Sequence, residues 1–272
     1  MTFIPYGKAA TDPWSVDITP AGAGWTYSGL RVVDLGDSPV EFDTGDTEVL
    51  VLPLAGACTA NSFELTGRAG VFAGPSDFAY FPIDTRVRLS GTGRIAIPSA
   101  RATKRLEPRH VPAEDVSVEV RGSGQATRQV NNFCSPEAFD CDKLMAVEVL
   151  TPGGNWSSYP PHKHDTAHPG EAVLEEIYYF EGGPGYQRVY TSEAGEIDTL
   201  AEVRSGDVVL VPYGYHGPSM AAPGYDLYYL NVLAGPGAER SMAFCDDPAH
   251  AWIRDSWRDQ DLDPRIPFGG TS

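Results

Sequence analysis

Glycine and proline interrupt this chain often and divide it into short apolar runs, and these frequent breaks limit what the chain can fold into. It contains 29 Gly and 23 Pro among 272 residues. The runs between them are rich in β-branched and aromatic residues, which is typical of strands joined by tight turns. In the first half they cover residues 30–35, 47–56, 62–65, 70–74, 78–83 and 94–100. We therefore expect an all-β fold built as a sandwich or barrel.

The length of the chain leaves room for two β lobes with buried cores. The stretch 101–127 is polar and ends in Gly and Ser, as expected of a connection. Residues 74–97 and 206–233 each contain a strand ending in Pro, a turn and a further apolar strand, which indicates a duplicated fold. We place the first lobe at residues 1–120 and the second at 121–272. The first lobe has no histidine before His110 and is expected to hold no metal.

Three histidines and one glutamate of the second half have the spacing of a metal site. His162 and His164 are two residues apart, so their imidazoles share one face of an extended strand. Glu176 opens the apolar run EIYYF, which we expect to form a hairpin with the His162 strand, and His216 follows the run GDVVLVPYG. This donor set suits one divalent Zn, Mn, Fe, Co or Ni ion per chain better than Ca or Mg. Glu175 remains an alternative to Glu176, because strand alternation lets only one of them face the ion.

These residues resemble the cupin double motif. Its first part matches Gly154, His162, His164, Glu176 and Gly182, and its second part matches Gly206, Pro212, Gly214 and His216. The segment 165–175, between His164 and Glu176, is longer than in the generic motif. The blocks 151–165, 174–180 and 222–236 resemble the 5-deoxyglucuronate isomerase family of myo-inositol catabolism. That resemblance implies a bicupin fold, with two β-sandwich or jelly-roll barrel lobes.

The same resemblance implies an activity. It is the metal-dependent aldose–ketose isomerisation of 5-deoxy-D-glucuronate to 2-deoxy-5-keto-D-gluconate, in which a divalent ion polarises the carbonyl. The sequence does not identify the general base. Three alternatives stay open: the related 4-deoxy-5-ketouronate isomerase, a cupin dioxygenase, and a non-catalytic sugar-binding cupin.

An anionic sugar acid needs a local positive charge, because the chain carries a net charge of −17. Cations can bind the substrate carboxylate, and tyrosines near the expected metal can contact the sugar. Lys163, between two inward histidines, should point away from the metal, and one tyrosine of the pair 228–229 should face it. The candidate substrate contacts are Arg128, Arg188, Lys163, Tyr178, Tyr228 and Tyr229.

The charge also excludes classes of partner. A net charge of −17 repels phosphate backbones and anionic lipids, and no Lys/Arg-rich run offsets it. No apolar stretch has the roughly 18 residues needed to span a bilayer, and the first residues lack the apolar core of a signal peptide. We expect a cytoplasmic protein whose partner is a small anionic sugar acid. A homo-oligomer is an open alternative, since the tail after residue 245 suits packing against another subunit.

Overall fold

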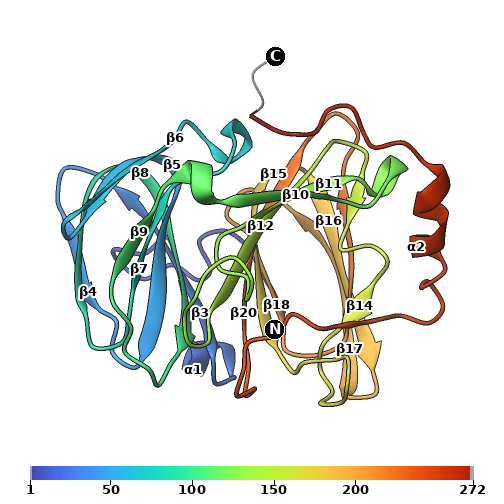
Figure 1. Cartoon of the computed structure of the whole chain (residues 1–272), viewed down its shortest axis with the longest axis horizontal. Coiled ribbons are helices and arrows are strands. Elements are labelled where there is room, and N and C mark those ends of the chain that lie inside the picture. Colours follow the sequence, from blue (N-terminus) through green and yellow to red (C-terminus); the bar gives the residue numbers. More distant parts are fainter. Residues whose placement is uncertain (1, 270–272) are drawn as a thin grey trace.

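The chain folds into three antiparallel sheets joined by short loops, which confirms the all-β prediction (Figure 1). The structure is a computed structural model that describes residues 2–269. Within that range no helix has the length and apolar character needed to cross a membrane. The helical elements are single turns: α1 (Pro20–Ala23), η1 (Val71–Ala73), η2 (Ala113–Asp115), η3 (Gly124–Ala126), α2 (Ile253–Ser256) and η4 (Trp257–Asp259).

The first half of the chain forms an eight-stranded sheet, drawn in blue and green in Figure 1. Its strands are β2 (Val16–Ile18), β3 (Ser28–Leu35), β4 (Val40–Asp43), β5 (Thr47–Ala60), β6 (Phe63–Arg68), β7 (Phe78–Phe81), β8 (Arg86–Arg101) and β9 (Arg109–Val111). The long strands β5 and β8 bend so that the sheet folds over a core of its own, which includes Val51 and Ile95. The strand predicted at 70–74 was wrong, because that segment is the turn η1 between two glycines.

The second half supplies most of two further sheets, which lie beside the first. The seven-stranded sheet has the order β1-β18-β15-β20-β12-β11-β10, and the six-stranded sheet has the order β17-β16-β19-β14-β21 with β13 paired to β19. Their strands are β1 (Phe3–Ile4), β10 (Ser117–Arg121), β11 (Arg128–Asn132), β12 (Met145–Thr151), β13 (Trp156–Ser157), β14 (His162–Lys163), β15 (Glu175–Gly182), β16 (Gly185–Ser192), β17 (Gly195–Val203), β18 (Val208–Val211), β19 (Tyr215–Ala221), β20 (Leu227–Ala234) and β21 (Cys245–Asp246).

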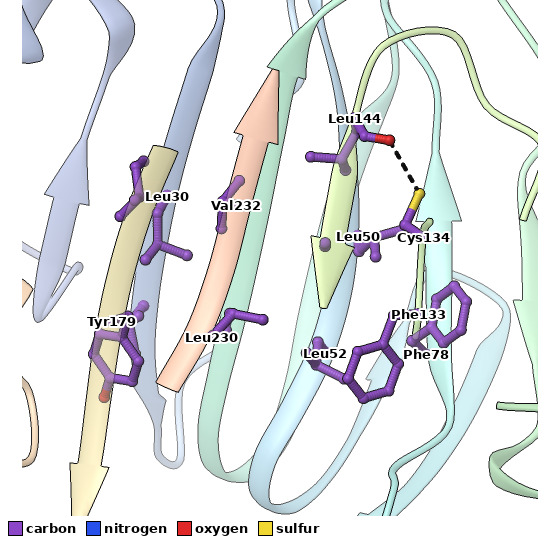
Figure 2. Packing of buried hydrophobic residues seen from close by; sticks show 14 of the residues in the cluster. Leu30, Leu50, Leu52, Phe78, Phe133, Cys134, Leu144, Tyr179, Leu230 and Val232 are labelled. Carbon is purple, nitrogen blue, oxygen red and sulfur yellow. Dashed lines mark hydrogen bonds between the residues drawn. The ribbon is translucent and has the colours of Figure 1, made fainter. Parts of the chain in front are cut away.

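The seven-stranded sheet is the middle layer of the molecule. Every residue of β12, β18 and β20 is buried, whereas β17 alternates between exposed and less exposed residues. A sheet covered on both faces needs such continuous apolar strands, and an outer sheet needs alternation. Figure 2 shows the cluster between the middle sheet and the eight-stranded sheet, with the labelled residues Leu30, Leu50, Leu52, Phe78, Leu144, Tyr179, Leu230 and Val232.

Alternation along β15 decides which side chains reach the other face of the middle sheet. Ile177 and Tyr179 pack into the cluster of Figure 2, while Tyr178 and Phe180 pack toward the six-stranded sheet. Glu176 therefore faces the six-stranded sheet too, since it lies two residues from Tyr178. The predicted site must lie between these two sheets.

The ends of the described chain cross between the halves. Near the N-terminus, β1 pairs with β18 at the edge of the middle sheet. The segment after η4 returns along the top of Figure 1, and the Phe268 ring packs 5.5 Å from the Phe72 ring of the first half. Each half of the molecule is therefore completed by residues from the opposite end of the sequence.

Candidate metal centre and pocket

A cavity of about 250 Å³ lies on the face of the middle sheet that Glu176 shares. Strands β15, β20, β12 and β11 form its floor, while β14 and the segment 242–254 lie across from them. Imidazoles and a carboxylate line one end: His162, His164 and Glu176. Arg121 and Arg128, on β10 and β11, line the other end, and Arg254 lies on the covering side, over the Phe244 ring.

Two predicted histidines and the predicted glutamate converge at the first end. The His164 Nε2 atom lies 2.8 Å from the Glu176 Oε2 atom, and the His216 Nε2 atom lies 3.0 Å from the same oxygen. The ligand atoms of the three residues all lie within 4.8 Å of one another, and all three side chains are buried. This spacing allows one ion to contact all three groups.

The contacts of Nδ1 in each imidazole indicate that Nε2, the atom near the carboxylate, carries no proton. The His164 Nδ1 atom lies 3.2 Å from the Leu174 carbonyl oxygen, and the His216 Nδ1 atom lies 3.1 Å from the Gly214 carbonyl oxygen. A ring N–H donated to a backbone carbonyl is the usual support of a metal-bound imidazole, and it leaves the Nε2 lone pair toward the metal. Both lone pairs then lie close to the same carboxylate, and a shared cation relieves the repulsion among these electron-rich atoms.

The His216 Nε2 atom also distinguishes a bound cation from a proton. It is buried and has no hydrogen-bond partner of suitable geometry among residues 2–269, although it lies 3.0 Å from Glu176. A proton on this nitrogen would not point at an acceptor, and a buried polar atom without a partner is costly. The residues present therefore fit a divalent metal ion.

The electrostatics of the cluster keep the carboxylate ionised. Burial alone raises the pKa of the Glu176 carboxyl, but positive charge at the position of the His216 and His164 imidazoles outweighs burial and holds that pKa well below its usual range. A carboxylate that stays ionised while fully buried is the form that binds a cation.

His162 lies next to this group but outside the set of converging ligand atoms. Its ring centroid is 4.4 Å from that of His216 and 6.2 Å from that of His164, and its ring also packs 4.7 Å from Phe244. His162 and His216 are cross-strand partners on β14 and β19, so their side chains lie side by side on the same face of that sheet. Its role as a fourth ligand stays a prediction.

The expected hairpin between the His162 strand and the Glu176 strand was wrong. β14 pairs with β19 and β21 in the six-stranded sheet, and β15 pairs with β18 and β20 in the middle sheet. The long segment 165–174 carries the chain from one sheet to the other, so Glu176 meets the imidazoles across the space between sheets. Glu175 points away: its carboxylate accepts the backbone N–H groups of Thr26, Tyr27 and Ser28.

Arg128 provides an unpaired charge at the second end of the pocket. Its side chain is buried, and its Nη1 atom donates to the Ala126 carbonyl oxygen at 3.1 Å. No carboxylate of residues 2–269 forms an ion pair with it. Burial and the charges of Arg121 and Arg254 lower the pKa of Arg128 to about 10. A buried guanidinium without a counterion favours an anionic ligand.

Three other predicted substrate contacts lie outside the pocket. Arg188 projects from β16 and forms an ion pair with Asp198. Lys163 points away from the imidazoles, as alternation predicts, and its Nζ atom lies 2.9 Å from Asp165 and 3.0 Å from Glu171. Tyr228 packs on the opposite face of β20, in the core between the middle sheet and the eight-stranded sheet. These side chains are therefore not placed to touch a ligand beside Glu176.

Tyr178 and Tyr229 line the pocket and are joined by a hydroxyl group. The Ser158 Oγ atom lies 3.1 Å from the Tyr178 hydroxyl and 3.0 Å from the Tyr229 hydroxyl. Ser158 has a φ of 46°, in the left-handed region that non-glycine residues seldom adopt, and such strain is often found at functional sites. Burial raises the pKa of both tyrosines, so each phenol stays protonated at neutral pH. They can donate hydrogen bonds but are poor bases.

Sequence reasoning missed the apolar lining of the pocket and four of its polar residues: Arg121, Ser158, Asn231 and Arg254. Arg121 is the cross-strand partner of Arg128, but its segment had the polar composition of a connection. Arg254 is far from the motifs in sequence, and only tertiary folding brings it to the cavity. The periodicity of β20 was the one available signal, because it places Asn231 on the same face as Tyr229.

Comparison with known proteins gives one family. The KduI/IolB family model matches residues 3–253. A 5-deoxy-glucuronate isomerase of Geobacillus kaustophilus is 41% identical over 255 residues, which is 89% of this chain and 91% of that protein. A 5-deoxy-glucuronate isomerase of Bacillus subtilis strain 168 is 38% identical, over 87% of this chain and 91% of that protein.

Solved structures agree with these sequence relationships. An IolB-like protein from Salmonella typhimurium LT2 superposes with a TM-score of 0.84 at 32% identity, covering 93% of this chain and 99% of that one. An oxalate decarboxylase of Lactobacillus farciminis superposes with a TM-score of 0.62 at 9% identity, covering 89% and 88%. The second likeness concerns the fold alone, which is cupin-like.

Proposed function

The chain belongs to the KduI/IolB family, and we propose that it is a metal-dependent aldose–ketose isomerase converting 5-deoxy-D-glucuronate to 2-deoxy-5-keto-D-gluconate in myo-inositol catabolism. The two relatives of 38–41% identity that carry this activity in their names support the substrate. The observation that carries the chemistry is the convergence of two imidazoles and one buried carboxylate opposite an unpaired guanidinium. A cytoplasmic location is part of the proposal, since the substrate is an intermediate of sugar breakdown.

We also propose the finer description of the fold, a bicupin whose second lobe alone holds the metal centre. The cupin-like neighbours align with this chain over about nine-tenths of its length, which supports two related lobes rather than one. The converging histidines all belong to the second half. In this view the first lobe supports the floor of the pocket through the core of Figure 2.

The proposed site residues divide into two groups. His164, Glu176 and His216 would hold one divalent transition metal ion, with His162 as a further ligand. When bound, such an ion supplies Lewis-acid polarisation of the substrate carbonyl and of the neighbouring hydroxyl group. Arg128 binds the carboxylate at the far end of the sugar acid, and its burial strengthens that contact.

The reaction moves one proton between neighbouring carbons and another between their oxygens, so the chain must orient the substrate and limit exchange with water. Tyr178 and Tyr229 donate hydrogen bonds from the pocket wall, and Ser158 fixes both phenols at once. Phe244 and the tail segment with Arg254 cover the cavity from the side opposite the sheet. A covered pocket strengthens each polar contact within it.

Turnover and metal content of the purified chain test the proposal together. We expect conversion of 5-deoxyglucuronate, loss of activity with a chelator and recovery when a divalent metal is restored. His164→Ala and His216→Ala should each lose bound metal, measured by mass spectrometry, while remaining folded by circular dichroism. His250→Ala, in the tail, is the matched control. Normal metal content in both site variants would contradict the assignment.

The nearest alternative is tested with a second substrate. An isomerase of 4-deoxy-5-ketouronate would need the same metal centre and the same cation, so the two ends of the pocket fit both substrates. The assay therefore runs both sugars under the same conditions. A higher kcat/KM for the ketouronate would make it the assigned substrate, and the assignment of the metal ligands would not change.

A further inference from the structure

The pocket floor changes its chemical character in strand order. From the metal end to the cationic end the strands are β15, β20, β12 and β11. The side chains that they contribute to the cavity are Glu176 and Tyr178, then Asn231 and Tyr229, then Val147 and Val149, then Val130 and Arg128. The order is thus carboxylate, amide, aliphatic groups and guanidinium. β15 and β11 are three strand spacings apart, about 14 Å, and side chains reaching inward from both ends shorten the gap.

The Asn231 side chain offers a buried amide donor at the middle of the pocket floor. Only 5% of the residue is exposed, and its Nδ2 atom has no hydrogen-bond partner of suitable geometry among residues 2–269. It lies between its cross-strand partners Tyr178 and Val147, so it faces the middle of the cavity. A buried amide donor left unpaired is costly, so this atom indicates a ligand oxygen at mid-pocket.

The next strand offers the opposite chemistry. Val147 and Val149 line the cavity, are 3% and 6% exposed, and adjoin Val130 on β11. They stand between the Asn231 amide and the Arg128 guanidinium. A ligand hydroxyl placed against these methyl groups would lose its water without gaining a partner, and an aliphatic wall of this kind rejects an added hydroxyl by up to about 100-fold.

The order of these groups along the pocket floor matches the order of functional groups along one kind of sugar acid. Resting on the proposed function, we propose that Asn231 and the pair Val147 and Val149 select a six-carbon acid with hydroxyl groups in mid-chain and a bare methylene beside its carboxylate. The Asn231 amide donates to a mid-chain hydroxyl while Arg128 binds the carboxylate. The valines then cover the methylene. Glucuronate, which carries a hydroxyl at that carbon, places it against the valines.

Val149→Thr tests the proposal, because it adds one hydroxyl with little change in shape. The measured quantity is the Ki of glucuronate as a competitive inhibitor divided by the KM for the deoxy substrate. This ratio should fall about threefold to tenfold, the value of one new hydrogen bond. Ring closure of the free sugars is the same for every variant and cancels from the comparison. Val147→Thr is the second variant should Val149→Thr fail to fold.

Val232→Thr is the matched control. Val232 on β20 is also buried but faces the core of Figure 2, so the ratio should not change. Asn231→Leu should raise KM and Ki together, because both sugars carry the mid-chain hydroxyl. An unchanged ratio in both threonine variants overturns this inference alone. Failure of the wild type to convert 5-deoxyglucuronate overturns the proposed function instead.

Discussion

A buried ion pair that joins the eight-stranded sheet to the middle sheet gives the sharpest prediction about stability. The Arg68 Nη1 and Nη2 atoms lie 2.7 and 2.8 Å from the two carboxylate oxygens of Glu148. The side chains are 3% and 0% exposed. Arg68→Met would leave the Glu148 carboxylate buried without a counterion, although the Asn131 amide still donates to it at 2.6 Å.

The expected magnitude follows from that burial. Removing one partner of a buried pair costs about 3–5 kcal/mol, because the remaining charge cannot return to water. For 272 residues, an unfolding entropy of about 2.1 cal/mol/K per residue makes each kcal/mol worth about 2 °C in Tm. Arg68→Met should therefore lower Tm by about 6 to 10 °C. Glu148→Gln added to Arg68→Met should recover much of that loss, since no unpaired charge then remains.

Thermal unfolding of the four proteins of this double-mutant cycle provides the assay. Arg101→Met is the control, because Arg101 forms an exposed pair with Asp46 at 3.0 Å and should shift Tm by less than about 2 °C. An Arg68→Met protein that melts within 2 °C of the wild type would refute the reasoning. A double variant as unstable as the single one would show that lost packing, and not the stranded charge, is responsible.

Three further predictions concern other parts of the chain. Burial raises the pKa of Asp77, but the backbone hydrogen bonds of residues 66 and 67 outweigh it and lower the pKa. The stabilisation is therefore present above the unfolded pKa of about 4 and lost as pH falls through the folded pKa. In urea unfolding, the free energy of unfolding of Asp77→Asn should lie below that of the wild type by a constant amount above pH 5. This difference should shrink below pH 4. A difference that stays constant down to pH 3 would contradict the prediction. Gly217→Ala should reduce kcat/KM at least about tenfold, because its Cβ would lie 1.8 Å from a backbone oxygen of the pocket wall, whereas Gly154→Ala, also at positive φ but in open space, should keep its activity. Equal activities of the two variants would contradict the conclusion that the backbone at Ser158 and Gly217 shapes the pocket. Arg128→Met should lower kcat/KM for the sugar acid about tenfold to 100-fold through loss of a charged hydrogen bond, while Arg188→Met should leave it unchanged, and the reverse result would reassign the carboxylate contact.

Local periodicity predicted those features of the site that depend on one strand. The two-residue repeat placed His162 on the pocket side of β14 and Lys163 on the other. It also allowed only one tyrosine of the pair 228–229 to face the pocket, and that residue is Tyr229. Both results need only the alternation of an extended strand.

Pairing between distant strands could not be predicted in this way. The hairpin expected between His162 and Glu176 assumed that neighbours in sequence pair, but segment 165–174 crosses between sheets. The sequence also could not show whether Arg188 faces the pocket, because that depends on which face of β16 packs toward the middle sheet. The guanidinium groups of Arg121 and Arg254 meet Arg128 only because a hairpin and the tail converge there. Each of these errors concerns a contact that no local pattern encodes.

The exchange of chain ends between the halves limits how this protein can be reduced in size. A fragment that begins near residue 117 would contain all the converging ligands but would lack β1, which covers the outer edge of β18. Its middle sheet would present an unprotected strand to solvent, and such edges recruit other chains. Adding Phe3 and Ile4 back as a short peptide, or fusing them through a linker, is the design that a minimal version of this isomerase would need.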